Sequence, residues 1–192
     1  APGSTFKLFS AHAGLANGII TPGEHYNDTG KYAFSRNCDT SVPPDQTNCY
    51  AQNAGGVGNG SVDLQRSLTV SSDTYFYRIG DLSWRARGSI GEDAMQQTMT
   101  TWGLGSPTGI DLPGEASGRI PTPEWLMEFS REYNADLPEE EIVERGTWKA
   151  GSSANTMVGQ GDVYATPLQL AQGYATLANG GTVWSPSLVL QV

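Results

Sequence analysis

At 192 residues the chain fits one domain, and a domain of that length can bury most of its apolar surface. Lys and Arg number 11 against 20 Asp and Glu, so the net charge of −9 argues against nucleic acid and, by charge alone, against an anionic membrane surface. No apolar run approaches the length that a membrane-spanning helix needs.

A helix is predicted at the N-terminal end of the chain. Pro2-Gly3 precedes an apolar pattern that continues to Leu15, and Asn17-Gly18 is a typical helix stop. Ser4 and Lys7 are three residues apart near its start, so their hydroxyl and amine can come within hydrogen-bond reach. A serine hydroxyl becomes a good nucleophile only when a base takes its proton. By itself, however, this spacing is equally typical of an amphipathic helix with a solvated lysine.

Residues 19–60 are rich in Gly, Pro, Asn and Asp, which predicts loops with short strands. Within them, Cys38 and Cys49 flank a turn-rich loop that contains prolines, an arrangement typical of a small disulfide. A zinc site would need four ligands, and His12 and His25 lie in unrelated contexts. A disulfide would indicate an oxidising compartment, and two free thiols are the alternative.

Three helices are predicted in the middle of the chain. The first opens at 61–64 with Ser61 as its N-cap and runs through Leu68. The second covers 74–87, and the third begins at 91–93 and ends near Gly103. No repeat and no interdomain linker is visible, so the chain is interpreted as one domain.

The second half of the chain is predicted to be mostly irregular until its last helix. Residues 103–123 are dense in turn residues, and a long connection follows, with Trp125, Phe129 and Trp148 as packing anchors. Within it, the acidic run 138–141 is interpreted as a solvated helix start. Thr166-Pro167 then predicts an N-cap and first residue of a helix that ends at Asn179-Gly180-Gly181.

A second polar motif, Ser71-Ser72-Asp73, has the form Ser-x-Asn with Asp in the third place. An ordinary helix N-cap would explain it equally well, since Ser and Asp are preferred caps. Its position after Ser-x-x-Lys is what favours serine acyl transfer, because the two motifs occur in this order in serine enzymes that react with penicillin.

Four blocks along nearly the whole chain resemble class B penicillin-binding proteins, most closely the elongation-type peptidoglycan D,D-transpeptidases. They are 2–7, 71–77, 103–115 and 159–181. The resemblance implies an α/β (α+β) fold like that of penicillin-binding transpeptidases and serine β-lactamases, with a helical subdomain against an antiparallel sheet. It implies that 1–192 is a fragment of one such domain, so the fold is partial in this chain.

The resemblance also implies a role for each motif residue. Ser4 attacks the penultimate D-Ala carbonyl of a stem peptide or the β-lactam ring, and Lys7 is the general base. Ser71 relays a proton to the leaving amine. Asp73 stands where most relatives carry Asn and holds Lys7 and the substrate amide.

The implied partners are stem peptides ending in D-Ala-D-Ala, β-lactams and wall-elongation proteins, with no cofactor, no metal and no nucleic acid. The implied location is the extracytoplasmic face of the bacterial cell membrane, with an anchor upstream of this chain. A third motif, Lys-Thr-Gly or Lys-Ser-Gly, is expected after Gly181; Lys149-Ala150-Gly151 comes too early and is interpreted as a loop. Without the flanking strands, reduced activity is expected, with poor cover of apolar residues: Phe6, Phe9, Leu168 and Leu170.

Three other functions are considered as alternatives. A β-lactam sensor domain would be acylated without turnover, and a D-alanyl-D-alanine carboxypeptidase would use water as acceptor. A class A β-lactamase fits worse, because no glutamate of 139–144 lies in the Glu-x-x-x-Asn setting expected for deacylation. The sequons that begin at Asn27 and Asn59 are given little weight.

Overall fold

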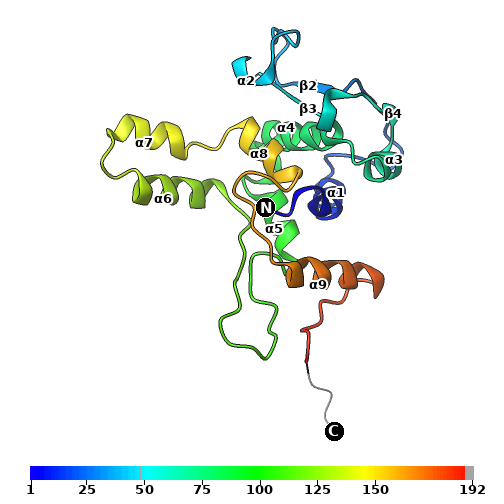
Figure 1. Cartoon of the computed structure of the whole chain (residues 1–192), viewed down its shortest axis with the longest axis vertical. Coiled ribbons are helices and arrows are strands. Elements are labelled where there is room, and N and C mark those ends of the chain that lie inside the picture. The colour runs from blue at the N-terminus through cyan, green and yellow to red at the C-terminus, as the bar shows by residue number, and fades with distance from the viewer. Residues whose placement is uncertain (48, 189–192) are drawn as a thin grey trace.

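The computed structural model describes residues 1–47 and 49–188. Figure 1 shows the strands and α2 at one end of the molecule, α9 toward the other, and the remaining core helices between them. Within the described residues, none of the helices combines the length and apolar character needed to cross a membrane. The elements are η1 (Gly3–Phe6), α1 (Lys7–Ala16), β1 (Tyr26–Asp28), β2 (Lys31–Ala33), α2 (Pro44–Thr47), β3 (Tyr50–Gln52), η2 (Ala54–Gly56), β4 (Gly60–Val62), α3 (Leu64–Thr69), α4 (Asp73–Ile90), α5 (Ala94–Thr100), α6 (Pro123–Tyr133), α7 (Glu139–Gly146), α8 (Ala150–Met157) and α9 (Pro167–Ala178).

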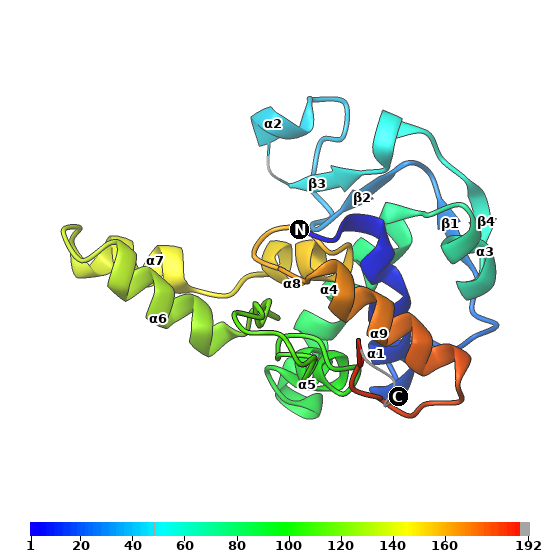
Figure 2. The same ribbon diagram turned by 60° about the horizontal axis from the view of Figure 1, so that its bottom comes forward.

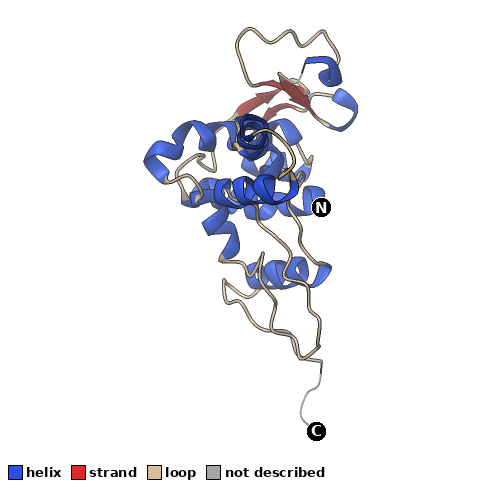
Figure 3. Ribbon diagram, turned by 90° about the vertical axis from the view of Figure 1, so that its left-hand side faces the viewer, coloured by secondary structure: helices blue, strands red, loops and turns tan. Residues whose placement is uncertain are grey.

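The strands form two small antiparallel sheets, as the turn-rich composition of 19–60 predicts. β1 pairs with β4 so that Tyr26 lies opposite Val62, and β2 pairs with β3 so that Lys31 lies opposite Gln52. Both sheets contact α4: Tyr26 of β1 packs on Tyr75, and Tyr32 of β2 donates to Asp81. The rest of the described chain is mainly helical, as Figure 3 shows. The mixed helical and antiparallel architecture is therefore confirmed.

The core surrounds α1, which packs against α4 and α5. Phe6 and Phe9 are completely buried, so the expectation that they would be poorly covered is wrong. The reason is close packing by α9: a Cβ on Gly173 would lie 2.5 Å from the Phe9 ring. Leu168 and Leu170 are half-buried. The large apolar side chains that are exposed around α9 belong to other positions, namely Tyr174, Leu177 and Trp184.

The predicted helices at 61–68, 74–87 and 91–103 are present, but the first begins later than expected. Ser61 lies in β4, where it pairs with Asn27, and cannot cap a helix. Asp63 is the N-cap of α3 instead, because its carboxylate accepts a hydrogen bond from the Arg66 backbone N–H. The pairing of β4 with β1, which are far apart in the sequence, decided this boundary.

The long connection expected after 123 is wrong, because it contains α6, α7 and α8. Helix α6 begins with Thr122 as N-cap and Pro123 in its first turn, the same signal that correctly predicts α9. Figures 1 and 2 show α6 and α7 side by side as a hairpin that projects from the body of the molecule. Lys149-Ala150-Gly151 is the start of α8 rather than a loop.

The three expected packing anchors are only half-buried. Along α6, Trp125 and Phe129 have ring centroids 5.0 Å apart, and Phe129 stacks on Tyr133 at 4.3 Å. Trp148 donates its indole N–H to Ser153 Oγ at 2.7 Å, which ties the start of α8 to the segment before it. The acidic run at 139–141 forms the first turn of α7, as predicted.

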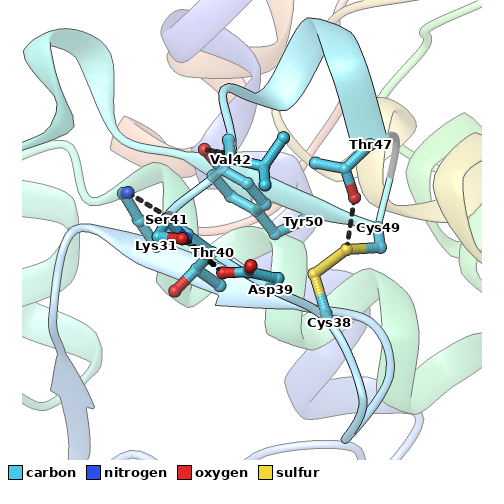
Figure 4. Close-up of a disulfide and its surroundings, with 9 residues drawn as sticks. All are labelled: Lys31, Cys38, Asp39, Thr40, Ser41, Val42, Thr47, Cys49 and Tyr50. Carbon is cyan, nitrogen blue, oxygen red and sulfur yellow. Dashed lines mark hydrogen bonds between the residues drawn. A yellow bond between two sulfur atoms is a disulfide. The ribbon is translucent and has the colours of Figure 1, made fainter.

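Cys38 and Cys49 form a disulfide, which confirms the prediction from their spacing (Figure 4). The bond closes the long connection between β2 and β3. Lys31 reinforces this connection by donating to the Thr40 carbonyl oxygen, and Tyr50 donates its hydroxyl to the Val42 carbonyl oxygen.

We expect the double substitution Cys38→Ser with Cys49→Ser to lower the free energy of unfolding by about 2–3 kcal/mol, because the unfolded chain loses a short covalent loop. Urea unfolding of the intact protein, with and without the substitutions, measures the difference. Alkylation of the native protein supplies the control. Two reactive thiols, or equal unfolding midpoints, would contradict the expectation.

Candidate active site

Ser4 lies in a tight turn at the start of the central helix. It is exposed, within η1, and η1 continues directly into α1. Gly3 has a φ of +61°, a conformation that favours glycine, and its N–H donates to the Gly159 carbonyl oxygen at 2.9 Å. The turn therefore leaves Ser4 exposed to solvent, and the hydrogen bond from Gly3 to Gly159 holds the backbone of the turn.

Gly159 supports this turn, a role that sequence reasoning missed although it identified the block at 159–181. Its φ is +68°, and a Cβ there would lie 2.4 Å from the Gly3 carbonyl oxygen and 2.5 Å from Phe6 Cβ. Any side chain at 159 would push the Ser4 turn away. The only sign of this role in the sequence is the glycine itself. The contact that requires a glycine is with Gly3 and Phe6, which are far from Gly159 along the chain.

Lys7 is buried to 2% exposure, and its ammonium group makes three hydrogen bonds. Nζ donates to the Ser71 carbonyl oxygen at 2.8 Å, to Ser71 Oγ at 3.0 Å and to Asp73 Oδ1 at 2.6 Å. Nζ also lies 5.6 Å from the centre of the Phe76 ring. The two motifs, more than 60 residues apart, thus meet at one atom.

The hydrogen bond expected between Ser4 and Lys7 is not among those of the described residues. An ammonium group has three donors, and all three of Lys7 point to Ser71 and Asp73. Lys7 must release one proton before it can accept another. The hydrogen bonds of Lys7 Nζ are therefore made with Ser71 and Asp73 rather than with Ser4.

The turn 71–73 is strained and firmly held. Ser71 has a φ of +55°, and within the described part of the chain it is the one residue other than glycine with positive φ. Such a conformation costs of order 1–3 kcal/mol and is maintained only by surrounding contacts. Ser72 caps α4 by accepting from the Tyr75 N–H, and Asp73 Oδ2 accepts from the Ala54 N–H at 3.1 Å.

Two features place positive charge close to Asp73. It occupies the first turn of α4, where the helix dipole stabilises an anion, and its partner Lys7 is a cation. Burial, and then the charge of Asp73, raise the pKa of Tyr77 to about 12.

The block at 103–115 has a structural role here. Gln169, completely buried on α9, donates to the carbonyl oxygens of Ser106 and Ser117, which fixes this loop against the helix. Inside the loop, the Glu115 carboxylate accepts from the N–H and the hydroxyl of Thr108, and these bonds lower the pKa of Glu115.

One cavity of the molecule lies away from these four residues. A cavity of about 260 Å³ is formed between α4, α5, α6 and α8, and none of Ser4, Lys7, Ser71 or Asp73 lines it. Within the residues that the structure describes, no group of three or more His, Cys, Asp or Glu side chains is placed to hold a metal ion. The candidate site consists of an exposed serine, a buried lysine, a second serine and a carboxylate.

These are the residue types of a serine acyl-transfer site of the Ser-x-x-Lys type. The family model of the penicillin-binding protein transpeptidase domain matches residues 1–192. The chain is 32% identical over 181 residues to the peptidoglycan D,D-transpeptidase MrdA of Acinetobacter baumannii, a match that covers 94% of this chain and 22% of that protein. The chain thus belongs to the penicillin-binding protein transpeptidase family.

Solved structures of penicillin-binding proteins have a similar fold. Pseudomonas aeruginosa PBP2 superposes with a TM-score of 0.73 at 32% identity, covering 97% of this chain and 35% of that one. PBP2 of Helicobacter pylori, in a complex with MreC, superposes with a TM-score of 0.72 at 24% identity, covering 97% of this chain and 29% of that one. The chain spans about a fifth to a third of the length of these proteins.

Proposed function

We propose that this chain is part of an elongation-type peptidoglycan D,D-transpeptidase that cross-links stem peptides through an acyl-enzyme on Ser4. The observation that carries the proposal is the convergence of Lys7 Nζ on Ser71 and Asp73, next to the exposed Ser4 turn. Family membership supports it, because the A. baumannii relative is named a peptidoglycan D,D-transpeptidase.

In the first half-reaction, Ser4 Oγ forms a bond to the carbonyl carbon of the penultimate D-Ala, and the peptide C–N bond to the last D-Ala breaks. The Ser4 proton passes to uncharged Lys7, and the leaving amine receives a proton. In the second half-reaction, an amine of a neighbouring stem peptide forms a new C–N bond, the ester C–O bond breaks, and Ser4 regains its proton. A β-lactam forms the same bond to Ser4 as its ring amide opens.

Ser71 is suited to the relay between these steps. Its Oγ lies 3.0 Å from Lys7 Nζ, so a proton collected by Lys7 can pass to Ser71 and from there to the leaving amine. The strained backbone at Ser71 supports this role, because it directs both the hydroxyl and the carbonyl oxygen of one residue toward Nζ. Asp73 holds Lys7 in place and compensates its charge.

We also infer the setting of the full-length protein. The disulfide supports an extracytoplasmic location in bacteria, and an N-terminal anchor is proposed outside this chain. Wall-elongation proteins are proposed as partners, by analogy with the complex of H. pylori PBP2 with MreC. The third motif and the sheet that carries it are proposed to come from the rest of the protein, so that residues 1–192 alone would be impaired.

Incubation of the full-length protein with a stem pentapeptide and an amine acceptor tests the function. We expect release of D-Ala together with a cross-linked peptide, and neither product from the Ser4→Ala variant. Release of D-Ala with a hydrolysed tetrapeptide alone would identify a carboxypeptidase. A persistent penicillin adduct without peptide turnover would identify a β-lactam sensor.

We expect Asp73→Asn to retain acylation within about 10-fold, because asparagine keeps one oxygen for Lys7 and loses only the bond from the Ala54 N–H. Asp73→Ala removes both contacts and should slow acylation about 10²-fold, since Lys7 is no longer held. Stopped-flow acylation by a chromogenic cephalosporin separates the two. Equally slow variants would show that the charge itself is required.

A further inference from the structure

A second carboxylate, Asp28, lies beneath the turn 71–73. It ends β1 and is 1% exposed. Four groups donate to it: the Gly30 N–H at 2.8 Å, the Asn53 amide at 2.9 Å to each oxygen, the Asn59 amide at 2.6 Å and the Ser72 hydroxyl at 2.7 Å. The last of these partners is the middle residue of the Ser71-Ser72-Asp73 motif.

Only an ionised carboxylate satisfies this set of donors, because it accepts hydrogen bonds and donates none. Burial raises the pKa of Asp28, but the hydrogen bonds from Asn59, Ser72, Asn53 and Gly30 outweigh it and lower the pKa to about 2. The group is therefore charged throughout the neutral range. An asparagine of the same shape would turn an N–H donor toward the amides of Asn53 and Asn59.

The contacts continue from Asp28 to the middle of the turn 71–73 and to the start of α4 that follows it. Ser72, held by Asp28, lies between Ser71 and Asp73 and caps α4. Asn53, also held by Asp28, accepts from the Thr74 N–H at 3.0 Å through its Oδ1. The next residue, Ala54, donates its N–H to Asp73 Oδ2. Asp28 thus fixes the segment that determines where Ser71 and Asp73 meet Lys7.

We propose that Asp28 is a positioning residue for acyl transfer. Its buried hydrogen bonds hold Ser71 and Asp73 within hydrogen-bond distance of Lys7 Nζ. The inference rests on the proposed function, because it assigns Asp28 a part in the Ser4 reaction. The hydrogen bonds of Asp28 contribute to how the strained Ser71 is maintained, since Ser72 and Asn53 hold the backbone that directly follows it.

The test measures acylation by a fluorescent penicillin in the full-length protein, with the rate constant and the non-covalent affinity determined separately. We expect Asp28→Asn to lower the rate constant per folded molecule about 10²-fold with little change in affinity, because the reacting groups are misplaced. The double variant Asp28→Asn with Asn59→Asp should recover to within about 10-fold, because the reversed pair restores a donor facing a carboxylate.

Ser72→Ala leaves Asp28 in place and removes its direct hydrogen bond to the turn, so it provides the test if Asp28→Asn fails to fold. It also loses a helix cap, so Thr122→Ala, which removes the cap of α6, is the matched control. We expect slow acylation in Ser72→Ala and wild-type acylation in Thr122→Ala. Wild-type rates in folded Asp28→Asn or in Ser72→Ala would overturn the inference. Failure of the wild-type protein to acylate would instead refute the proposed function.

Discussion

Gly159→Ala should reduce penicillin acylation of the full-length protein by about 10²-fold or more, because it displaces the turn that presents Ser4. The added Cβ would lie 2.4 Å from the Gly3 carbonyl oxygen and 2.5 Å from Phe6 Cβ, distances that real side chains do not tolerate. The turn would have to move, and the hydrogen bond from Gly3 N–H to the Gly159 carbonyl oxygen would weaken. Overpacking of this kind costs typically about 1–3 kcal/mol of stability as well.

Gly161 offers a matched control two residues away. Its φ of +63° is nearly that of Gly159, so alanine suffers the same backbone strain at both positions. The nearest atom to a Cβ at 161, however, is Asn155 Cβ at an ordinary 3.5 Å. We expect Gly161→Ala to lose some thermal stability and to acylate normally. Equal acylation rates in the two variants would show that Gly159 does not support the Ser4 turn.

Lys7→Ala should lower the acylation rate constant by about 10³–10⁴-fold, the contribution of a general base together with the organisation it provides. Lys7 is buried, and its three hydrogen bonds join η1 and α1 to the turn 71–73. Its loss also leaves Asp73 without its cation, although Asp73 is partly solvated at 18% exposure. The rate constant is obtained by stopped flow, and thermal unfolding checks that the variant is folded.

Lys31→Ala is the control for removal of a lysine that also bonds to the backbone. Lys31 donates to the Thr40 carbonyl oxygen in the disulfide loop and touches none of the four site residues. It should acylate at the wild-type rate. A Lys7→Ala variant that is folded and acylates within 10-fold of wild type would remove Lys7 from the mechanism.

Local signals predicted much of the fold. The helix caps at Ser72 and Thr166, the stop at Asn17-Gly18 and the disulfide of Cys38 depend on neighbouring residues, and all are present. The start of α7 was predicted from its acidic run. Helix α6 was missed although Thr122-Pro123 carries the same signal as Thr166-Pro167. The dense turns before it suggested a continuing loop, and its half-buried aromatic residues resemble anchors of an irregular segment.

The candidate site could be predicted as a set of residues but not as a geometry. Ser71 and Asp73 do meet Lys7, as the motifs suggested. The choice of Ser71 and Asp73 as the partners of Lys7 Nζ depends on where α4 begins relative to α1, and no local pattern encodes this. Asp28 and Gly159 were missed for the same reason. Each acts through contacts with segments far along the chain, and Asp28 was seen only as part of a sequon.

The central claim is that Ser4 is the nucleophile, and mass spectrometry of the full-length protein after incubation with penicillin tests it most directly. We expect one covalent adduct, located by fragmentation on the peptide that contains Ser4, and no adduct in Ser4→Ala. An adduct on any other residue, or undiminished labelling of Ser4→Ala, would contradict the account.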